Sequence, residues 1–274
     1  MNPFLRDLLR PAALAVLCNP AFGSLLAWLS RDKINLQGLL FDTSSKVISP
    51  YVKALIFWGL YEFREINAVR RFMRRDLDVI ELGGSVGAVT AHIGTVLQHD
   101  RRLVTVEANP LLADQLKHAV LLHAPHCRLS VVSKAVDYGN SLNGPVSFSI
   151  KSDTTVSQIA ELGNRVRSES ATLQVPTTTL HELVCNFSID DYVLVADIEG
   201  AEIPMLFSEA AALARCQQII IELHHGYWAN RHWAPRDVAA IMENEHGFTL
   251  EHQNGPVYVF ARPCASHNAT STLA

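Results

Sequence analysis

The chain has 274 residues, of which 49% are hydrophobic, and this length is enough to bury one sizeable core. With 23 basic and 27 acidic residues its formal net charge is −4, which argues against a broad basic surface for nucleic acid. The five cysteines are odd in number and form no C-x-x-C pair. They favour a reducing compartment, so a cytoplasmic location is expected, and they argue against a disulfide framework and a zinc site.

Residues 1–75 are expected to be mostly helical, with a break at Ser49-Pro50. The apolar stretch from Leu8 to Leu29 is interrupted by two prolines, an asparagine and a glycine, so its uninterrupted runs are too short to cross a bilayer. We therefore predict an N-terminal helical extension over residues 1–56. Peripheral contact of this segment with a membrane surface is a secondary expectation.

Strand-like and helix-like stretches alternate from residue 77 onward, which is typical of a doubly wound parallel sheet. Strands are predicted over 77–82, 103–107, 127–133, 192–196 and 218–223. Helices are predicted over 87–98, 110–123, 179–185, 201–214 and 235–245. The runs 248–252 and 257–261 flank Asn254-Gly255-Pro256 and predict an antiparallel hairpin at the sheet edge. Residues 137–170 break the alternation as a long polar insertion with one β run at 146–150, and we expect it to form a lid over a substrate.

The most informative stretch joins the first two strands. Gly83 and Gly87 let the backbone turn tightly and approach a ligand without a Cβ in the way. Glu81 precedes the glycines, where an acid would repel a pyrophosphate but suits an ammonium group. Glu107 ends the second strand, where a carboxylate can accept hydrogen bonds from a ribose diol. S-adenosylmethionine has a ribose, an amino acid end and no phosphate, so the pattern favours this cofactor.

Several motifs together resemble the FkbM-type family of S-adenosylmethionine-dependent methyltransferases over residues 57–262, leaving 263–274 as a disordered tail. The motifs are Glu81–Gly87, Trp58–Glu62, Glu107–Pro110, Val175–Leu180, Asp197–Glu202 and Ile219–His224. The resemblance implies the class I methyltransferase fold, a Rossmann-like α/β domain whose seven-stranded sheet has an antiparallel last strand. It also implies an O-methyltransferase acting on a hydroxyl of a saccharide, glycan or secondary metabolite.

The resemblance assigns cofactor contacts to residues along the predicted sheet edge. Glu81, Gly83 and Gly87 would surround the methionine part, Glu107 the ribose, and Ala135 would lie beside the adenine. Asn109 of the Glu107–Pro110 motif and Asp197, near the transferred methyl, complete the cofactor set. Contacts with the acceptor are expected from Tyr61, Glu62, Glu199 and, in the insertion, from Thr154 and Ser157.

A hydroxyl is a poor nucleophile and needs a base as its proton leaves. Asp197 and Glu222 end neighbouring predicted strands, and His224 lies two residues further on the same face. We predict these three as catalytic, with His224 as the general base. Glu202 is left out, because an acid early in a helix is favoured by the helix dipole.

Two other kinds of function are weighed against the methyltransferase. A nicotinamide-dependent oxidoreductase is disfavoured by the missing G-x-G-x-x-G pattern and by Glu81. A non-catalytic, cofactor-binding scaffold in a glycan-assembly complex stays open. A divalent metal held by the same oxygen and imidazole ligands is considered but not favoured, so no metal site is assigned. The expected partner is a small-molecule or glycan acceptor, with no nucleic acid.

Overall fold

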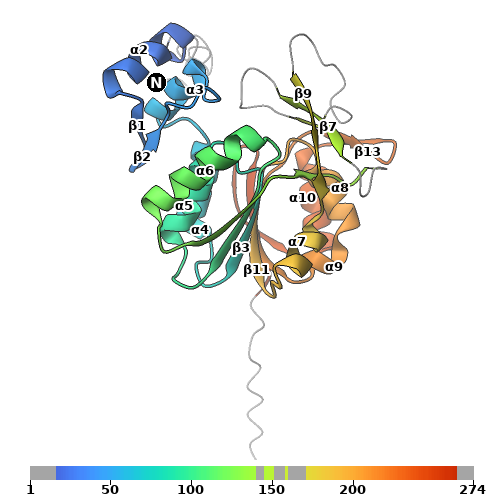
Figure 1. The fold of residues 1–274 in the computed structure, drawn as a ribbon. Coiled ribbons are helices and arrows are strands. Elements are labelled where there is room, and N and C mark those ends of the chain that lie inside the picture. Colours follow the sequence, from blue (N-terminus) through green and yellow to red (C-terminus); the bar gives the residue numbers. More distant parts are fainter. Residues whose placement is uncertain (1–16, 140–144, 151–157, 160–170, 264–274) are drawn as a thin grey trace, which may run out of the picture.

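The structure, a computed structural model, describes residues 17–139, 145–150, 158–159 and 171–263. A seven-stranded sheet lies at its centre, with the strand order β15-β16-β12-β11-β3-β4-β5 (Figure 1). The strands are β3 (Asp78–Leu82), β4 (Arg102–Val106), β5 (Arg128–Val132), β11 (Tyr192–Ala196), β12 (Cys216–Glu222), β15 (Thr249–Asn254) and β16 (Val257–Ala261). β16 is antiparallel to both of its neighbours, while β5, β4, β3, β11 and β12 run parallel. The predicted fold class, including the antiparallel last strand, is confirmed.

The central strands are continuous apolar runs, because helices cover both faces of the sheet. All five residues of β11 are buried. One face packs against α4 (Phe63–Phe72), α5 (Ala88–Val96) and α6 (Pro110–His123). The other packs against α7 (Leu180–Asn186), α8 (Glu202–Ser208), α9 (Ala210–Leu213) and α10 (Pro235–Asn244). Figure 1 shows these two helical layers on opposite sides of β3 and β11.

The helix predicted over 201–214 is in fact two short helices, α8 and α9. Glu209 separates them, with a backbone at φ −113° and ψ 30° that departs from helical geometry. Its carboxylate accepts the N–H of His181 in α7 at 3.1 Å. This tertiary contact, which no local pattern reveals, accompanies the break.

The N-terminal extension is only partly helical, and the prediction is wrong for residues 33–42. Between α2 (Pro20–Ser30) and α3 (Pro50–Phe57) lies the hairpin of β1 (Lys33–Leu36) and β2 (Leu39–Asp42). Buried and exposed residues alternate along β1, as in a half-buried strand. Gln37 and Gly38 both have positive φ, as a two-residue type I′ turn requires. None of the helices in the described part of the chain has the length and hydropathy needed to span a bilayer.

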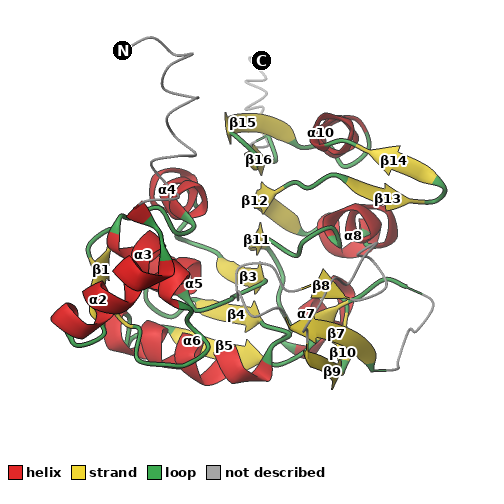
Figure 2. Cartoon of the chain, turned by 90° about the horizontal axis from the view of Figure 1, so that it is seen from above, coloured by secondary structure: helices red, strands yellow, loops and turns green. Residues whose placement is uncertain are grey.

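The insertion contributes the predicted strand β7 (Val146–Ile150), which pairs with β8 (Gln158–Ile159) and β9 (Ala171–Val175) in a small antiparallel sheet. Beside it, β6 (Ala135–Val136) pairs with β10 (Thr177–Thr178). Thr154 and Ser157 lie outside the described residues, and the lid expected over residues 137–170 stays a prediction. Figure 2 shows the insertion strands gathered beyond α7, and the hairpin of β13 (Gly226–Trp228) and β14 (Arg231–Trp233), which the sequence analysis did not predict, next to α8.

Candidate functional site

The glycine loop after β3 is packed too tightly for side chains at its key positions. Gly83 has φ +91°, and a Cβ there would lie 1.9 Å from the carbonyl oxygen of Asp197. At Gly87, with φ +85°, a Cβ would lie 2.8 Å from the Cα of Leu116 in α6. The loop is therefore held between the end of β11 and α6, and glycine is required by both conformation and space.

Glu107, at the end of β4, is fixed by backbone donors on both sides. Its Oε2 accepts the N–H of Ser85 at 2.7 Å, and its Oε1 accepts the N–H of Asn109 at 2.6 Å. Burial raises the pKa of Glu107 above its ordinary value, against these two hydrogen bonds. Each carboxylate oxygen has two lone pairs, so each retains one for a further donor. The group therefore suits the vicinal hydroxyls of a ribose.

Asn109 begins α6, where its side-chain oxygen accepts the N–H of Leu111 at 3.1 Å. Its side-chain nitrogen is buried and has no hydrogen-bond partner among the described residues. Ala135, the residue predicted beside the adenine, is buried in β6, and its N–H donates to the carbonyl of Pro176 at 2.9 Å. The chain thus leaves one donor, the Asn109 amide, available to a ligand on this side of the site.

Glu81 lies in β3 and is 1% exposed. Neither of its carboxylate oxygens has a hydrogen-bond partner within the described part of the chain. Burial raises the pKa of Glu81 to about 7, and the nearby hydroxyls of Thr105 and Thr90 oppose the shift only in part. An unpaired buried carboxylate is costly, so this position favours a cationic ligand or a proton.

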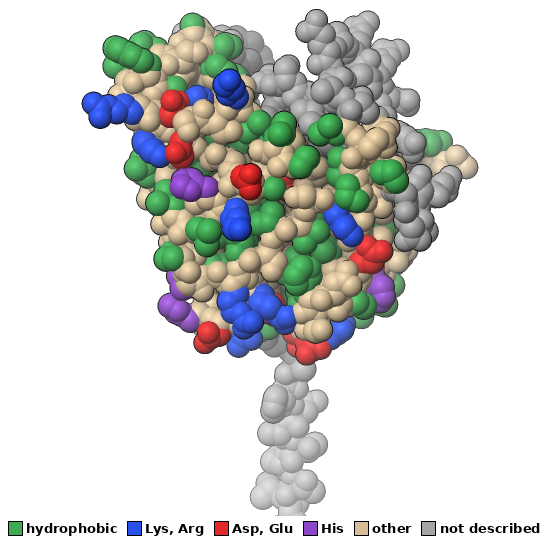
Figure 3. Space-filling model, viewed as in Figure 1, with side chains coloured by type: hydrophobic (Ala, Val, Ile, Leu, Met, Phe, Trp, Pro, Cys, Tyr) green, Lys and Arg blue, Asp and Glu red, His purple; other side chains and the backbone are tan. Residues whose placement is uncertain are grey.

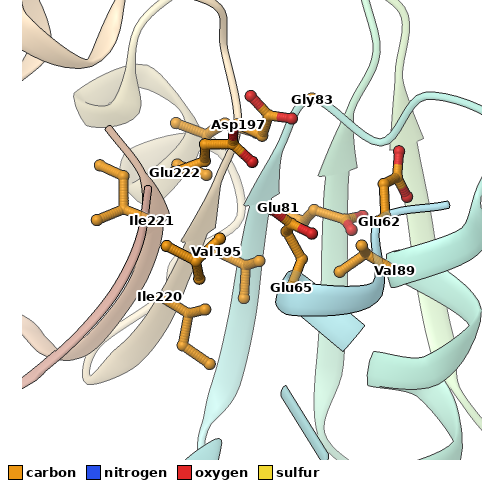
Figure 4. A pocket seen from close by; sticks show the side chains of 13 residues that line it. Glu62, Glu65, Glu81, Gly83, Val89, Val195, Asp197, Ile220, Ile221 and Glu222 are labelled. Atoms are coloured by element: carbon orange, nitrogen blue, oxygen red, sulfur yellow. The ribbon is translucent and has the colours of Figure 1, made fainter. Parts of the chain in front are cut away.

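Glu81 faces a small cavity of about 20 Å³, enough for one water or an ammonium-sized group. Figure 4 shows the acidic side chains that line it; they come from β3, from the start of α4 and from the ends of β11 and β12, and are Glu62, Glu65, Glu81, Asp197 and Glu222. Burial, with the neighbouring carboxylates of Glu65 and Asp197, raises the pKa of Glu62 well above its ordinary value. The wall of the cavity is acidic, and burial favours the protonated forms of Glu62 and Glu81.

Tyr61, predicted to contact the acceptor, is only 4% exposed. Its hydroxyl lies 2.9 Å from the Oγ of Ser85 in the glycine loop. The adjacent Glu62 has φ +46°, an uncommon conformation for a residue other than glycine. The segment that enters α4 is thus attached to the glycine loop, with Glu62 among the cavity residues.

His224 follows β12 and lies within a ring of carboxylates, which brings the three predicted catalytic residues together. Its Nδ1 lies 3.2 Å from Oε1 of Glu202. Its Nε2 lies 3.6 Å from Oε1 of Glu222 and 3.9 Å from Oδ1 of Asp197. Glu199, predicted as an acceptor contact, lies at 3.8 Å from the same nitrogen.

The electrostatics of this ring leave a proton on the imidazole. Burial lowers the pKa of His224, but the hydrogen bond and charge of Glu202, followed by the charge of Asp197, outweigh it and raise the pKa to about 9. Burial, with Glu65, raises the pKa of Glu222 to about 8. Burial, with Glu222, also raises the pKa of Asp197 well above its ordinary value. All three shifts favour the protonated forms of these side chains.

Glu202 is the residue that the sequence analysis missed. It is fully buried, and its carboxylate accepts the N–H groups of Ile198 at 3.0 Å and Gly200 at 2.8 Å. The turn before it has positive φ at Glu199 and at Gly200, which folds the carboxylate back over the loop. The signal was the acid two residues after a glycine at a helix start, a capping position that here also holds a histidine.

The part of the chain that contains Glu107, Asp197 and His224, but not Glu81 or the glycine loop, matches a known protein family. A family model described as the methyltransferase FkbM domain matches residues 89–250. No characterised protein with a curated description matches the chain by sequence. A ribosomal protein L11 methylase from Lactobacillus delbrueckii subsp. bulgaricus is similar in structure, with 9% identity, a TM-score of 0.38, and coverage of 74% of this chain and 78% of that one. A precorrin-6y C5,15-methyltransferase from Geobacter metallireducens has 11% identity, a TM-score of 0.37, and coverage of 73% and 87%. At such TM-scores neither carries an argument about the chemistry of this chain.

Proposed function

We propose, from the premise that this chain belongs to the methyltransferase FkbM family, that it transfers a methyl group from S-adenosylmethionine to a hydroxyl of a saccharide, glycan or secondary metabolite. The observation that carries the proposal is Glu81, a buried carboxylate without a partner on the wall of an acidic cavity beside Gly83. A cofactor with an ammonium and a sulfonium group supplies the missing positive charge. A nicotinamide dinucleotide, with its anionic pyrophosphate, would be repelled.

The residues fit the parts of this cofactor in turn. The cavity of Glu81 and Glu62 suits the ammonium group, since a charge-assisted hydrogen bond to a buried carboxylate is stronger than a neutral one. Glu107 suits the ribose diol through its two free lone pairs. Ala135, which has no side chain large enough to intrude, suits the adenine. When bound, S-adenosylmethionine supplies a methyl group on a positively charged sulfur, which a nucleophile can displace.

We place the acceptor hydroxyl at Asp197, Glu222 and His224. These side chains come from the ends of two adjacent parallel strands. Carboxylate oxygens of Asp197 and Glu222 lie close to the imidazole Nε2 of His224 there. The cluster holds the hydroxyl in line with the methyl and takes its proton. Because His224 carries a proton at neutral pH, it serves as a base only after added positive charge has lowered its pKa.

The proposal is tested with methyl-labelled S-adenosylmethionine, the full chain, and a glycan or metabolite extract, with mass spectrometry of the products. We expect a product that carries the labelled methyl group as a methyl ether, and an equal amount of S-adenosylhomocysteine. Glu81→Gln should lose most of both, and Glu251→Gln, an exposed acid on β15, should lose neither. Cofactor binding without any S-adenosylhomocysteine, across acceptor extracts, would support the scaffold alternative instead.

A further inference from the structure

We infer that the side chains around Nε2 of His224 form a binding site for one divalent metal ion. Its ligands are His224 Nε2 and carboxylate oxygens of Asp197, Glu199 and Glu222. This inference rests on the proposed function for its role, because the ion would lie where we place the acceptor hydroxyl; with Nε2 on the ion and Nδ1 on Glu202, a carboxylate of the cluster would take the proton in place of His224. The evidence for the metal site itself is geometric, so metal binding and the proposed methyl transfer are tested separately.

The distances around Nε2 match a shared ion better than direct hydrogen bonds. The three carboxylate oxygens lie 3.6, 3.8 and 3.9 Å from Nε2, and each distance is longer than a hydrogen bond. Nitrogen and oxygen ligands about 2.1 Å from a metal ion in tetrahedral geometry lie about 3.4 Å apart. Small side-chain rotations therefore bring these atoms into one coordination sphere. Of the proposed ligands, Asp197 and His224 belong, with Glu202, to a group whose ligand atoms all lie within 4.8 Å of one another, whereas Glu199 and Glu222 lie outside that group and would have to rotate toward the ion.

The imidazole is oriented for metal binding by the carboxylate behind it. Nδ1 lies 3.2 Å from the fully buried Glu202, whose oxygens are also held by two backbone N–H groups. Metal-bound histidines almost always donate their second ring nitrogen in this way, which fixes the tautomer and the ring orientation. Glu202 thus acts as a positioning residue and leaves Nε2 directed at the other three carboxylates.

A further observation that favours a cation is a ligand atom that lacks a partner. Oδ1 of Asp197 is buried and, among the described residues, makes no hydrogen bond. S-adenosylmethionine brings one net positive charge. The excess of carboxylates leaves a demand for more, which a divalent ion meets.

The donor set indicates the kind of ion. Carboxylate oxygens suit Mg²⁺, Ca²⁺ and Mn²⁺, whereas imidazole nitrogen suits Zn²⁺ and other transition metals. One imidazole with several carboxylates therefore favours Mn²⁺ or Zn²⁺ over Mg²⁺ and Ca²⁺.

The test is metal titration of the full chain after treatment with EDTA, without cofactor. Binding of MnCl₂, ZnCl₂, MgCl₂ and CaCl₂ is measured by calorimetry, and free Mn²⁺ also by electron paramagnetic resonance. We expect one equivalent of Mn²⁺ or Zn²⁺ to bind, with protons released as the ion displaces them. His224→Ala and Glu222→Gln should each weaken binding by about tenfold or more. His225→Ala, which removes the neighbouring imidazole that stacks on His232, should leave it unchanged.

Saturable binding of none of the four ions, or equal affinity in wild type, His224→Ala and Glu222→Gln, would overturn the inference. Melting curves identify a variant that fails to fold, and the other variant then decides. S-adenosylmethionine affinity measured in EDTA separates this inference from the proposed function. Cofactor binding without metal binding refutes the metal site alone, and metal binding without cofactor binding refutes the proposed function alone.

Discussion

Burial of the Glu81 carboxylate makes the free energy of unfolding depend on pH. Its pKa rises from the ordinary 4.5 to about 7, because burial disfavours the charged form by more than the hydroxyls of Thr105 and Thr90 stabilise it. The folded state therefore holds a proton that the unfolded chain releases at lower pH. The stability that this proton contributes is fully present below pH 4.5 and is lost as the pH rises through about 7.

We expect Glu81→Gln to become more stable relative to wild type as the pH is raised from 5 to 8. The amide has no charge to bury, and the shift corresponds to a relative gain on the order of 3 kcal/mol. Urea denaturation of both proteins across this range measures it. A difference in unfolding free energy that stays constant with pH would contradict the assignment. The same variant should bind S-adenosylmethionine more weakly at pH 8, where the wild-type carboxylate is charged.

Glu107→Ala is expected to weaken S-adenosylmethionine by about 2–3 kcal/mol, because both ribose hydroxyls lose a charged acceptor. The structure adds a cost in stability, since the N–H groups of Ser85 and Asn109 also lose their acceptor. Calorimetry at a temperature where the variant is folded separates the two effects. A folded variant with unchanged cofactor affinity would defeat the ribose assignment.

The three residues predicted as catalytic show how far local sequence rules can place side chains. Strand alternation and parallel adjacency were enough to predict that Asp197, Glu222 and His224 converge. Glu202 could not be assigned its contact with His224, because that contact depends on a loop folding back across the strand ends. Glu62 was predicted as an acceptor contact, but its place beside Glu81 depends on how α4 packs against the sheet.

At the scale of elements, the turn between β3 and α5 brings the glycine loop against the end of β11. Gly83→Ala should destabilise the fold and abolish cofactor binding, because the new Cβ would collide with the Asp197 carbonyl as well as strain a positive φ. Gly38→Ala is the matched control, with φ +101° but no atom within 4 Å of the new Cβ. It should cost only about 1 kcal/mol for the backbone conformation.

Urea denaturation of the two glycine variants gives the comparison directly. The difference between them isolates the close approach of β11 to the glycine loop. Equal, small losses in both would mean that Gly83 is needed only for its conformation.

Long elements followed from the sequence more readily than short ones. The five parallel strands and α6 were predicted because their apolar runs are continuous or carry clear caps, as Asn109 and Pro110 do for α6. β1 and β2 have four residues each, and the helical patterns on both sides obscured their alternation. β13 and β14, with three residues each, have no comparable pattern.

At the scale of the whole molecule, the N-terminal helices present an apolar face. Trp28 is 75% exposed and Leu29 is 64% exposed, both on α2. Figure 3 shows hydrophobic side chains over this upper-left part of the surface. The membrane contact expected from the sequence stays a prediction. Trp28 and Leu29 would make that contact, because exposed tryptophan and leucine favour a bilayer interface.

We predict that the full chain sediments with vesicles containing anionic lipids and that a Trp28→Ser, Leu29→Ser double variant does so several-fold less. Tyr227→Ser removes an aromatic ring of similar exposure on β13 and serves as the control. Equal sedimentation of the double variant and wild type would assign the apolar face another role.

The central claim is that the acidic strand ends and the glycine loop hold S-adenosylmethionine, and calorimetric titration of the purified full chain measures this most directly. We expect one cofactor molecule to bind per chain, with affinity reduced at least about tenfold in Glu81→Gln and in Glu107→Ala. We expect no binding of NAD or NADP under the same conditions. Absence of S-adenosylmethionine binding by the folded wild-type chain, or tighter binding of a nicotinamide dinucleotide, would contradict the account.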